Sequence, residues 1–140
     1  MQTQDPLLIL LVDDDPAEFT ILERKLTDFD GAPLKLEHVS DIDAAVARVG
    51  GRDVDLVLLD NRLNPSVDFR ETAPKLRGAG FVGPIGIISS DISDAYISKF
   101  LDYGVDFRIG KDELDANAIS FIVAEYVWDT LSETCAEDLR

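Results

Sequence analysis

The sequence predicts an α/β fold in which five parallel strands form one doubly wound sheet with helices on both faces. Two observations carry this prediction. Short apolar runs alternate five times with patterns typical of helices. The apolar runs are also almost uninterrupted, which is typical of strands that are buried on both faces of a parallel sheet.

The five strands are assigned to the apolar runs in chain order. They are expected at 7–12, about 34–39, about 56–60, about 85–89 and about 106–109. No linker, repeat or low-complexity stretch separates them, and 140 residues with 46% hydrophobic content suit one modest core. We therefore expect a single domain over residues 1–140, with its core at about 7–131 and without an output domain.

The first helix is expected to begin after Asp15, which has the residue type of an N-cap. Pro16 then stands at the first helical position, and Glu18 is placed for a capping-box bond. The residues expected to face the core from this helix are Phe19, Leu22, Leu26 and Phe29.

The next two helices follow the second and third strands. Ser40 and Asp43 repeat the capping pattern for the second helix, and Gly50 is placed to end it. The third helix is expected at about 67–77 and contains Pro74, so it should be bent or split there.

The last two helices are expected at about 93–103 and about 115–134. The core-facing stripe of the final helix is expected to be Ile119, Ile122, Val123, Tyr126 and Val127. Phe121 and Trp128 share the opposite face, where the core does not need them. We therefore consider both aromatic residues candidates for a protein contact, either self-association or docking of a kinase.

Composition excludes several classes of function. The net charge of −15 argues against nucleic acid as a partner, because binding a phosphate backbone relies on Lys and Arg. The single cysteine, Cys135, cannot form an internal disulfide, which suits a reducing compartment. The apolar run 7–12 is too short to span a bilayer and has no basic leader. We expect a cytoplasmic protein with no membrane segment.

Polar residues suited to phosphate chemistry follow four of the five strands. They are Asp13-Asp14-Asp15, Asp60, Ser89-Ser90 and Lys111. Because ligands of open parallel sheets bind outside the carboxyl ends of the strands, we expect these side chains to converge on one edge. Carboxylates can hold Mg²⁺, a hydroxyl and an ammonium can hold phosphate oxygens, and Asp15 is interpreted as the helix cap.

Four sequence blocks carry a resemblance to a known family. LLVDDDP, DLVLLDNRL, PIGIISSD and GVDFRIGK resemble, in order and spacing, the signature blocks of the response-regulator receiver domain, the CheY-like family. The resemblance covers about residues 7–131. With right-handed crossovers it implies the flavodoxin-like strand order 2-1-3-4-5.

The resemblance also implies a metal site and a phosphoryl acceptor. Asp60 matches the residue that becomes phosphorylated. Asp13, Asp14, Asp60 and the backbone carbonyl of Arg62 match the ligands of Mg²⁺, the implied cofactor. Mg²⁺ would cancel the repulsion between the acceptor and the incoming phosphate.

Three further positions match residues around the phosphoryl group. Lys111 and Ser89 would each contact an equatorial oxygen, while the small neighbour Ser90 would leave the donor's path open. The implied function is that of a stand-alone receiver in two-component signalling. It would take a phosphoryl group from phosphohistidine of a sensor histidine kinase or phosphotransfer protein and then dephosphorylate itself.

The sequence departs from the family pattern at three positions. Asp112 follows Lys111 where a proline is common, and the usual proline after the acceptor is displaced to Pro65. Arg108 stands where receivers usually carry a switch Tyr or Phe, and a guanidinium cannot be buried like a phenyl ring without a partner. Phe107 should face the opposite side of the strand.

These departures bear on how the protein would act. Coupling to the face formed by helix four, strand five and helix five, a possible homodimer surface, is in doubt. Arg62 and Asp91 flank the path of the hydrolytic water in this family. We expect the protein to act by contact or as a phosphate sink, with Arg62, Ser90, Asp91 and Arg108 as modulating residues.

Two alternative classes remain open. A pseudo-receiver would act only as an interaction module, although the acid set is complete. A small phosphohydrolase of the haloacid-dehalogenase type would use Asp13 as nucleophile and Asp15 as acid/base, which leaves the block around Asp60 unexplained. His38 has no companion of metal-binding type and is interpreted as a structural residue, not a ligand.

Overall fold

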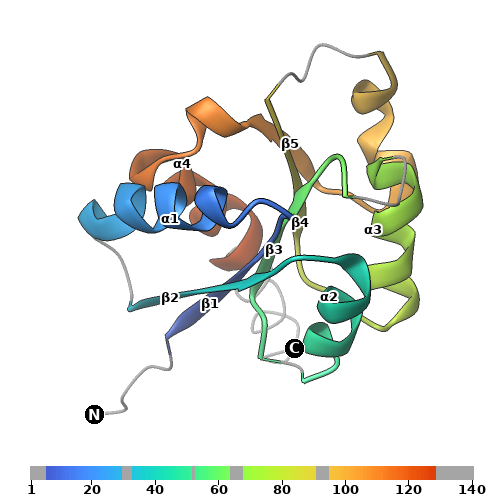
Figure 1. Cartoon of the computed structure of the whole chain (residues 1–140), viewed down its shortest axis with the longest axis horizontal. Coiled ribbons are helices and arrows are strands. Elements are labelled where there is room, and N and C mark those ends of the chain that lie inside the picture. Colours follow the sequence, from blue (N-terminus) through green and yellow to red (C-terminus); the bar gives the residue numbers. More distant parts are fainter. Residues whose placement is uncertain (1–5, 30–32, 52, 64–67, 91–94, 129–140) are drawn as a thin grey trace, which may run out of the picture.

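The computed structural model of the protein describes residues 6–29, 33–51, 53–63, 68–90 and 95–128. Five parallel strands form one sheet in the order β2-β1-β3-β4-β5 (Figure 1), which confirms the predicted fold class and strand order. Their bounds are β1 (Leu7–Val12), β2 (Leu34–Val39), β3 (Leu56–Asp60), β4 (Ile85–Ser89) and β5 (Phe107–Gly110). All five fall within a residue or so of the predicted positions.

Helices cover both faces of the sheet (Figure 1). α1 (Pro16–Lys25) and α4 (Ala116–Ile122) pack on one face. α2 (Ile42–Val49), α3 (Phe69–Gly78) and a 3₁₀ segment (Ala95–Tyr103) pack on the other. No helix in the described part of the chain is long and apolar enough to cross a membrane.

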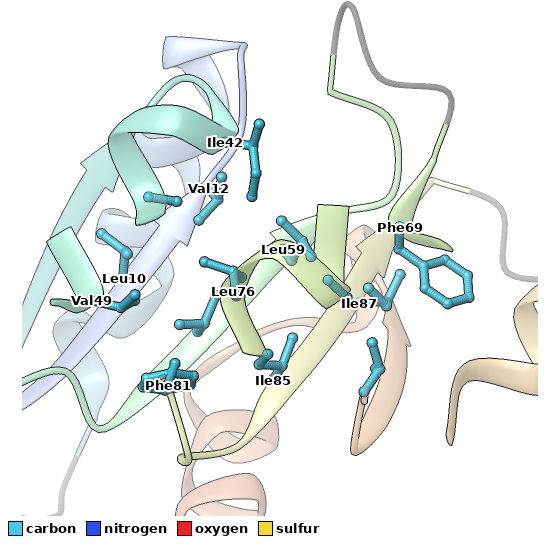
Figure 2. Close-up of a cluster of buried hydrophobic side chains, with 14 of the residues drawn as sticks. Leu10, Val12, Ile42, Val49, Leu59, Phe69, Leu76, Phe81, Ile85 and Ile87 are labelled. Carbon is cyan, nitrogen blue, oxygen red and sulfur yellow. The ribbon is translucent and has the colours of Figure 1, made fainter. Parts of the chain in front are cut away.

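The strands contribute alternate side chains to two cores. In β1, Ile9 and Leu11 face α1 and α4, whereas Leu10 and Val12 face α2 and α3. Figure 2 shows the second core, where Leu59, Ile85 and Ile87 of the sheet meet Ile42, Val49, Phe69, Leu76 and Phe81. Each of these side chains is buried, and burial of one such side chain stabilises a fold by roughly 1.5–3 kcal/mol.

α1 begins as predicted and ends earlier than expected. The Asp15 side chain accepts a hydrogen bond from Ala17 N at 3.0 Å, and Pro16 is the first helical residue. Leu26 and Phe29 still pack on the core, but they follow α1, in and after a 3₁₀ turn (Leu26–Asp28).

The cap of α2 differs from the prediction. Asp41, not Ser40, is the N-cap, and its carboxylate accepts from Ala44 N at 2.7 Å. Ser and Asp are both favourable N-cap residues, so which of the two caps α2 depends on the backbone geometry after the end of β2.

The prediction was a bend or a split at Pro74, and of these the split is wrong, because α3 is continuous across the proline. Its N-cap is Asp68, and Phe69 and Leu76 are completely buried on either side of the proline. This burial holds both halves of the helix on the sheet. Residue 67, where the helix was expected to start, lies outside the described residues.

The segment expected to be the fourth α-helix is a 3₁₀ segment instead, with a non-helical backbone at Lys99 (φ −96°, ψ 23°). The Ser98 hydroxyl donates to Ala95 O at 2.7 Å, a local bond that competes with α-helical pairing. Residue 93, its expected start, is not described.

The final helix is less regular than predicted. α4 passes into a π-helical segment (Val123–Trp128), and residues beyond 128 are outside the described part. The expected core stripe is confirmed: Ile119, Ile122, Val123 and Val127 are buried, and Tyr126 is half-buried. Phe121 is 64% exposed, and the Trp128 side chain is outside the description.

Candidate functional site

Three carboxylates meet at the carboxyl ends of β1 and β3. Asp13 is completely buried, Asp60 is 7% exposed, and Asp14 is exposed. One oxygen from each lies within 4.8 Å of the others. The two strands are neighbours and parallel, so their ends place Asp13 and Asp60 side by side. The sequence-based prediction that these acids converge is confirmed.

Lys111 provides the positive charge of this cluster. It follows β5, and its Nζ lies 3.1 Å from Asp13 Oδ2 and 3.6 Å from Asp60 Oδ1. Glu18, in the first turn of α1, is the third carboxylate near it, at 3.9 Å. Lys25 Nζ donates to the Lys111 carbonyl at 3.5 Å. The ammonium therefore faces more negative charge than it can neutralise.

Backbone donors orient the two buried carboxylates. Asp15 N donates to Asp13 Oδ1 at 2.9 Å, and Arg62 N donates to Asp60 Oδ1 at 3.5 Å. Asp13 Oδ2 is buried, and its partner among the described residues is the Lys111 ammonium, which it contacts as an ion pair. This oxygen has spare capacity to bind a cation.

The electrostatics of the site are shifted by burial and by like charge. Burial, and then the charge of Asp13, raise the pKa of Asp60 to about 7, against the lowering effect of Lys111. Burial alone would lower the pKa of Lys111, but the charges of Asp60 and Asp13 outweigh it and the pKa is raised. Lys111 is thus charged at neutral pH.

The donor set fits Mg²⁺. This hard cation prefers oxygen ligands and is usually held by one or two carboxylates together with waters and phosphate oxygens. A buried carboxylate oxygen without a hydrogen bond, next to an exposed carboxylate, offers both a fixed ligand and a path from solvent.

The other predicted site residues follow the ends of β3 and β4 where the structure describes them. Ser89 ends β4 beside Gly110 of β5 and is half-buried, and Ser90 follows it exposed to solvent. Arg62 is exposed, two residues after Asp60. Asp91 and Pro65 lie outside the described residues.

Arg108 and Phe107 lie on opposite sides of β5, as predicted. Phe107 is 7% exposed and packs against the Tyr126 ring, with centroids 4.8 Å apart. Arg108 is exposed, and its guanidinium lies over the Phe100 ring, 5.9 Å from the centroid. This cation–π contact keeps the charge at the surface.

Sequence reasoning missed one residue at the edge of the site. His38 Nε2 lies 2.7 Å from the backbone oxygen of Asp13. The sequence favoured a structural role for this residue, and nothing in it indicated that the ring reaches the acid loop, because that depends on the pairing of β2 with β1.

Comparison with known proteins identifies the family and agrees with the fold. The family model of the response regulator receiver domain matches residues 9–122. The chain therefore belongs to the response regulator receiver domain family, whose members act in two-component signalling. It is 28% identical over 120 residues to the two-component response regulator ORR41 of Oryza sativa subsp. japonica, covering 84% of this chain and 92% of that protein.

Solved structures show the same fold at low identity. The receiver domain of an HD domain-containing protein from Pseudomonas fluorescens has a TM-score of 0.76 at 20% identity, covering 96% of each chain. The receiver domain of a sensor histidine kinase from Pseudomonas aeruginosa has a TM-score of 0.70 at 22% identity, covering 88% of this chain and 98% of that one. The latter structure has a magnesium ion coordinated in its active-site cleft.

Proposed function

We propose that the protein accepts a phosphoryl group on Asp60 from a phosphohistidine of a sensor histidine kinase or phosphotransfer protein. The observation that carries this proposal is that the Asp60 carboxylate lies next to the acid pair Asp13 and Asp14 and 3.6 Å from the ammonium of Lys111. Phosphoryl transfer needs a positioned nucleophile and positive charge around the transferred group, and this site offers both.

In the proposed step, an oxygen of the Asp60 carboxylate attacks the phosphorus of phosphohistidine. The P–N bond breaks and its electron pair returns to the imidazole, while a new P–O bond forms an acyl phosphate. Lys111 then shifts its charge toward the added phosphoryl oxygens, and Ser89 donates its hydroxyl to another. Ser90, which is exposed, leaves the approach to this oxygen open.

Asp13, Asp14, Asp60 and the carbonyl of Arg62 are the proposed ligands of Mg²⁺. When bound, the ion supplies positive charge to neutralise the acids and the phosphoryl oxygens. Without such charge, the pKa of about 7 leaves a large share of Asp60 protonated at neutral pH, and a protonated carboxyl is a poor nucleophile.

We further propose that the acyl phosphate is hydrolysed at the same site and that the protein acts as a phosphate sink. Water attacks the phosphorus, the P–O bond to Asp60 breaks, and inorganic phosphate leaves with the carboxylate restored. The exposed Arg108 supports this role, because its charge is held at the surface by Phe100 and it has no buried ring to move. Arg62 and Asp91 are the proposed modulators of the water.

Three further proposals concern the location and the partners of the protein. Its single cysteine supports a cytoplasmic location, and its charge of −15 disfavours nucleic acid. Phe121, 64% exposed, and Trp128 are the proposed contact residues for self-association through the face that includes β5 and the final helix. Sedimentation of the parent and of Phe121→Ser would test that contact.

The central experiment is phosphorylation with acetyl phosphate or a phosphorylated histidine kinase, followed by mapping of the modified aspartate. Asp60→Asn should abolish Mg²⁺-dependent labelling and leave the fold intact, since the side chains are nearly isosteric. Asp112→Asn, an exposed acid beside Lys111, is the matched control and should be labelled normally.

Two results would support other classes. Labelling that survives in Asp60→Asn but is lost in Asp13→Ser would indicate the haloacid-dehalogenase type. A parent protein that is never labelled, with either donor, would indicate an interaction module without phosphoryl chemistry.

A further inference from the structure

We propose that His38 is a positioning residue for the cation: it holds the peptide that joins Asp13 to Asp14, and thereby sets the orientation of both acids. This inference rests on the proposed function, because it takes these acids to be metal ligands. The residue itself would not touch the ion or the phosphoryl group.

The geometry places His38 directly against the acid loop. Its Nε2 is 2.7 Å from Asp13 O. A carbonyl oxygen can only accept, so Nε2 must carry the hydrogen and donate it. The imidazole also stacks on Phe19 of α1, with ring centroids 5.5 Å apart and an interplanar angle of 23°. Two contacts, one polar and one apolar, therefore fix the ring.

The contact extends the pairing of β1 with β2 beyond the end of β1. β1 ends at Val12, and Asp13 N still donates to Val39 O at 3.1 Å. The carbonyl of the same residue then accepts from the His38 side chain. Both backbone polar groups of Asp13 are thus satisfied by β2, which matters because Asp13 is completely buried and water cannot replace a lost partner.

The consequence reaches the carboxylates through one peptide plane. Asp13 O belongs to the peptide unit whose nitrogen is that of Asp14, so fixing its direction restricts the backbone of both residues. The Asp13 carboxylate is then locked from the other side, where Oδ1 accepts from Asp15 N. What remains is Oδ2, which has no hydrogen-bond partner among the described residues and contacts only the Lys111 ammonium, so it is the oxygen we propose turns to a bound cation. Removing a hydrogen-bond partner that orients a metal ligand typically weakens the affinity for the metal by about 10–100-fold.

The test separates the hydrogen bond from the stacking. His38→Phe keeps an aromatic ring against Phe19 but has no donor for Asp13 O. His38→Gln loses the ring but carries an amide N–H at about the distance of Nε2 from the backbone. Glu37→Gln is the matched control: Glu37 is the neighbour of His38 in β2, and its replacement weakens an ion pair with Arg48 of α2, away from the acid loop.

The measurements are the Mg²⁺ dissociation constant by titration calorimetry and the melting temperature of the metal-free protein. We expect His38→Phe to bind Mg²⁺ about 10-fold more weakly. His38→Gln should stay within about threefold of the parent, and Glu37→Gln should match the parent in affinity even where it melts earlier. A purely structural role would lower the melting temperatures without this order in the affinities.

Several outcomes would overturn the inference. If His38→Phe binds Mg²⁺ like the parent, or if His38→Gln loses as much affinity as His38→Phe, the hydrogen bond does not position the acids. If His38→Phe fails to fold, His38→Gln decides the question by itself. A large loss of Mg²⁺ affinity in His38→Gln would then overturn the inference, and retained affinity would support it. A parent that binds no Mg²⁺ at all would instead refute the proposed metal site.

Discussion

The ammonium of Lys111 lies 3.1 Å from Asp13 Oδ2, a buried oxygen that receives no hydrogen bond within the described part of the chain. The same ammonium is farther, at 3.6 Å, from the proposed acceptor Asp60. In the metal-free protein Lys111 therefore serves mainly to hold the buried acids together, and a bound cation would release it for the phosphoryl group.

Replacing the ammonium should destabilise the metal-free protein. Lys111→Met keeps the apolar stem but leaves Asp13 and Asp60 without their counter-charge. We expect a loss on the order of 2 kcal/mol in urea denaturation at neutral pH, less than for a fully buried pair because Asp60 can take up a proton. Lys35→Met, at a mostly exposed pair with Glu37, is the control and should change stability by less than about 1 kcal/mol. Equal effects of the two variants would contradict this role of Lys111.

Stability without metal should depend on the protonation of Asp60. Its pKa is about 7 in the folded protein against an ordinary value of 3.8, so the folded state holds this proton more tightly. The stabilisation of the folded state by this proton is fully present below about pH 4 and is lost as the pH rises through about 7. Asp60→Asn should therefore gain stability relative to the parent between about pH 5 and about pH 8, by an order of a few kcal/mol. A difference that stays constant with pH would contradict the raised pKa.

Mg²⁺ should stabilise the fold by mass action. Like charges at Asp13, Asp14 and Asp60 repel, and an ion that binds only the folded state removes this repulsion. We expect millimolar Mg²⁺ to raise the melting temperature, and the affinity to fall below about pH 7, where Asp60 must first lose a proton. Asp60→Asn, with one carboxylate fewer, should respond less. An unchanged melting curve of the parent would count against a metal site.

The sequence predicted the site because strand ends in a parallel sheet share one edge. Asp13, Asp60 and Lys111 each follow an apolar run, so their convergence depends only on the order and direction of the strands. The contribution of His38 was not predictable in this way. Its reach depends on the register of an edge strand, and that register is a long-range property of the fold.

The helices also combine features that the sequence predicted with features that it did not. The core stripe of the final helix follows from spacing alone, and it was confirmed. The change to π-helical pairing after Ile122 was not foreseen, nor was the non-helical backbone at Lys99. Periodicity reports which side chains face the core, but it is insensitive to small differences in helical pitch. The choice of Asp41 over Ser40 as a cap depends on backbone geometry that neither residue type reveals.

Gly86 of β4 should be intolerant of a side chain. A Cβ there would lie 2.1 Å from two ring atoms of Phe107, which is itself packed against Tyr126. Gly86→Ala should destabilise the protein by about 1–3 kcal/mol in denaturant titrations, because a buried ring must move. In a Phe107→Leu background the same change should cost less, since leucine lacks the two ring atoms that would lie at 2.1 Å. An equal cost in both backgrounds would rule out this explanation.

The sink role predicts a short-lived acyl phosphate. We expect decay within minutes or less after removal of the donor, which corresponds to a barrier on the order of 20 kcal/mol. The decay of radiolabelled protein would measure it, with Arg62 and Asp91 varied singly and together. An exposed pair between them would be worth only ~0–1 kcal/mol, so either sign of their effect is compatible with the role. A half-life of many hours would instead favour a persistent contact signal through Phe121 and Trp128.

The residues of the site are far apart in the sequence, and this separation has a consequence for folding during synthesis. Asp13 and Asp14 follow β1 and Asp60 ends β3, but the ammonium that balances these three acids follows β5. A nascent chain that ends before Lys111 therefore holds the buried negative charge without its counter-ion. The addition of β5 to the sheet is then the step that brings Lys111 to the buried acids and neutralises part of their charge. The site is complete only after almost the whole domain has left the ribosome.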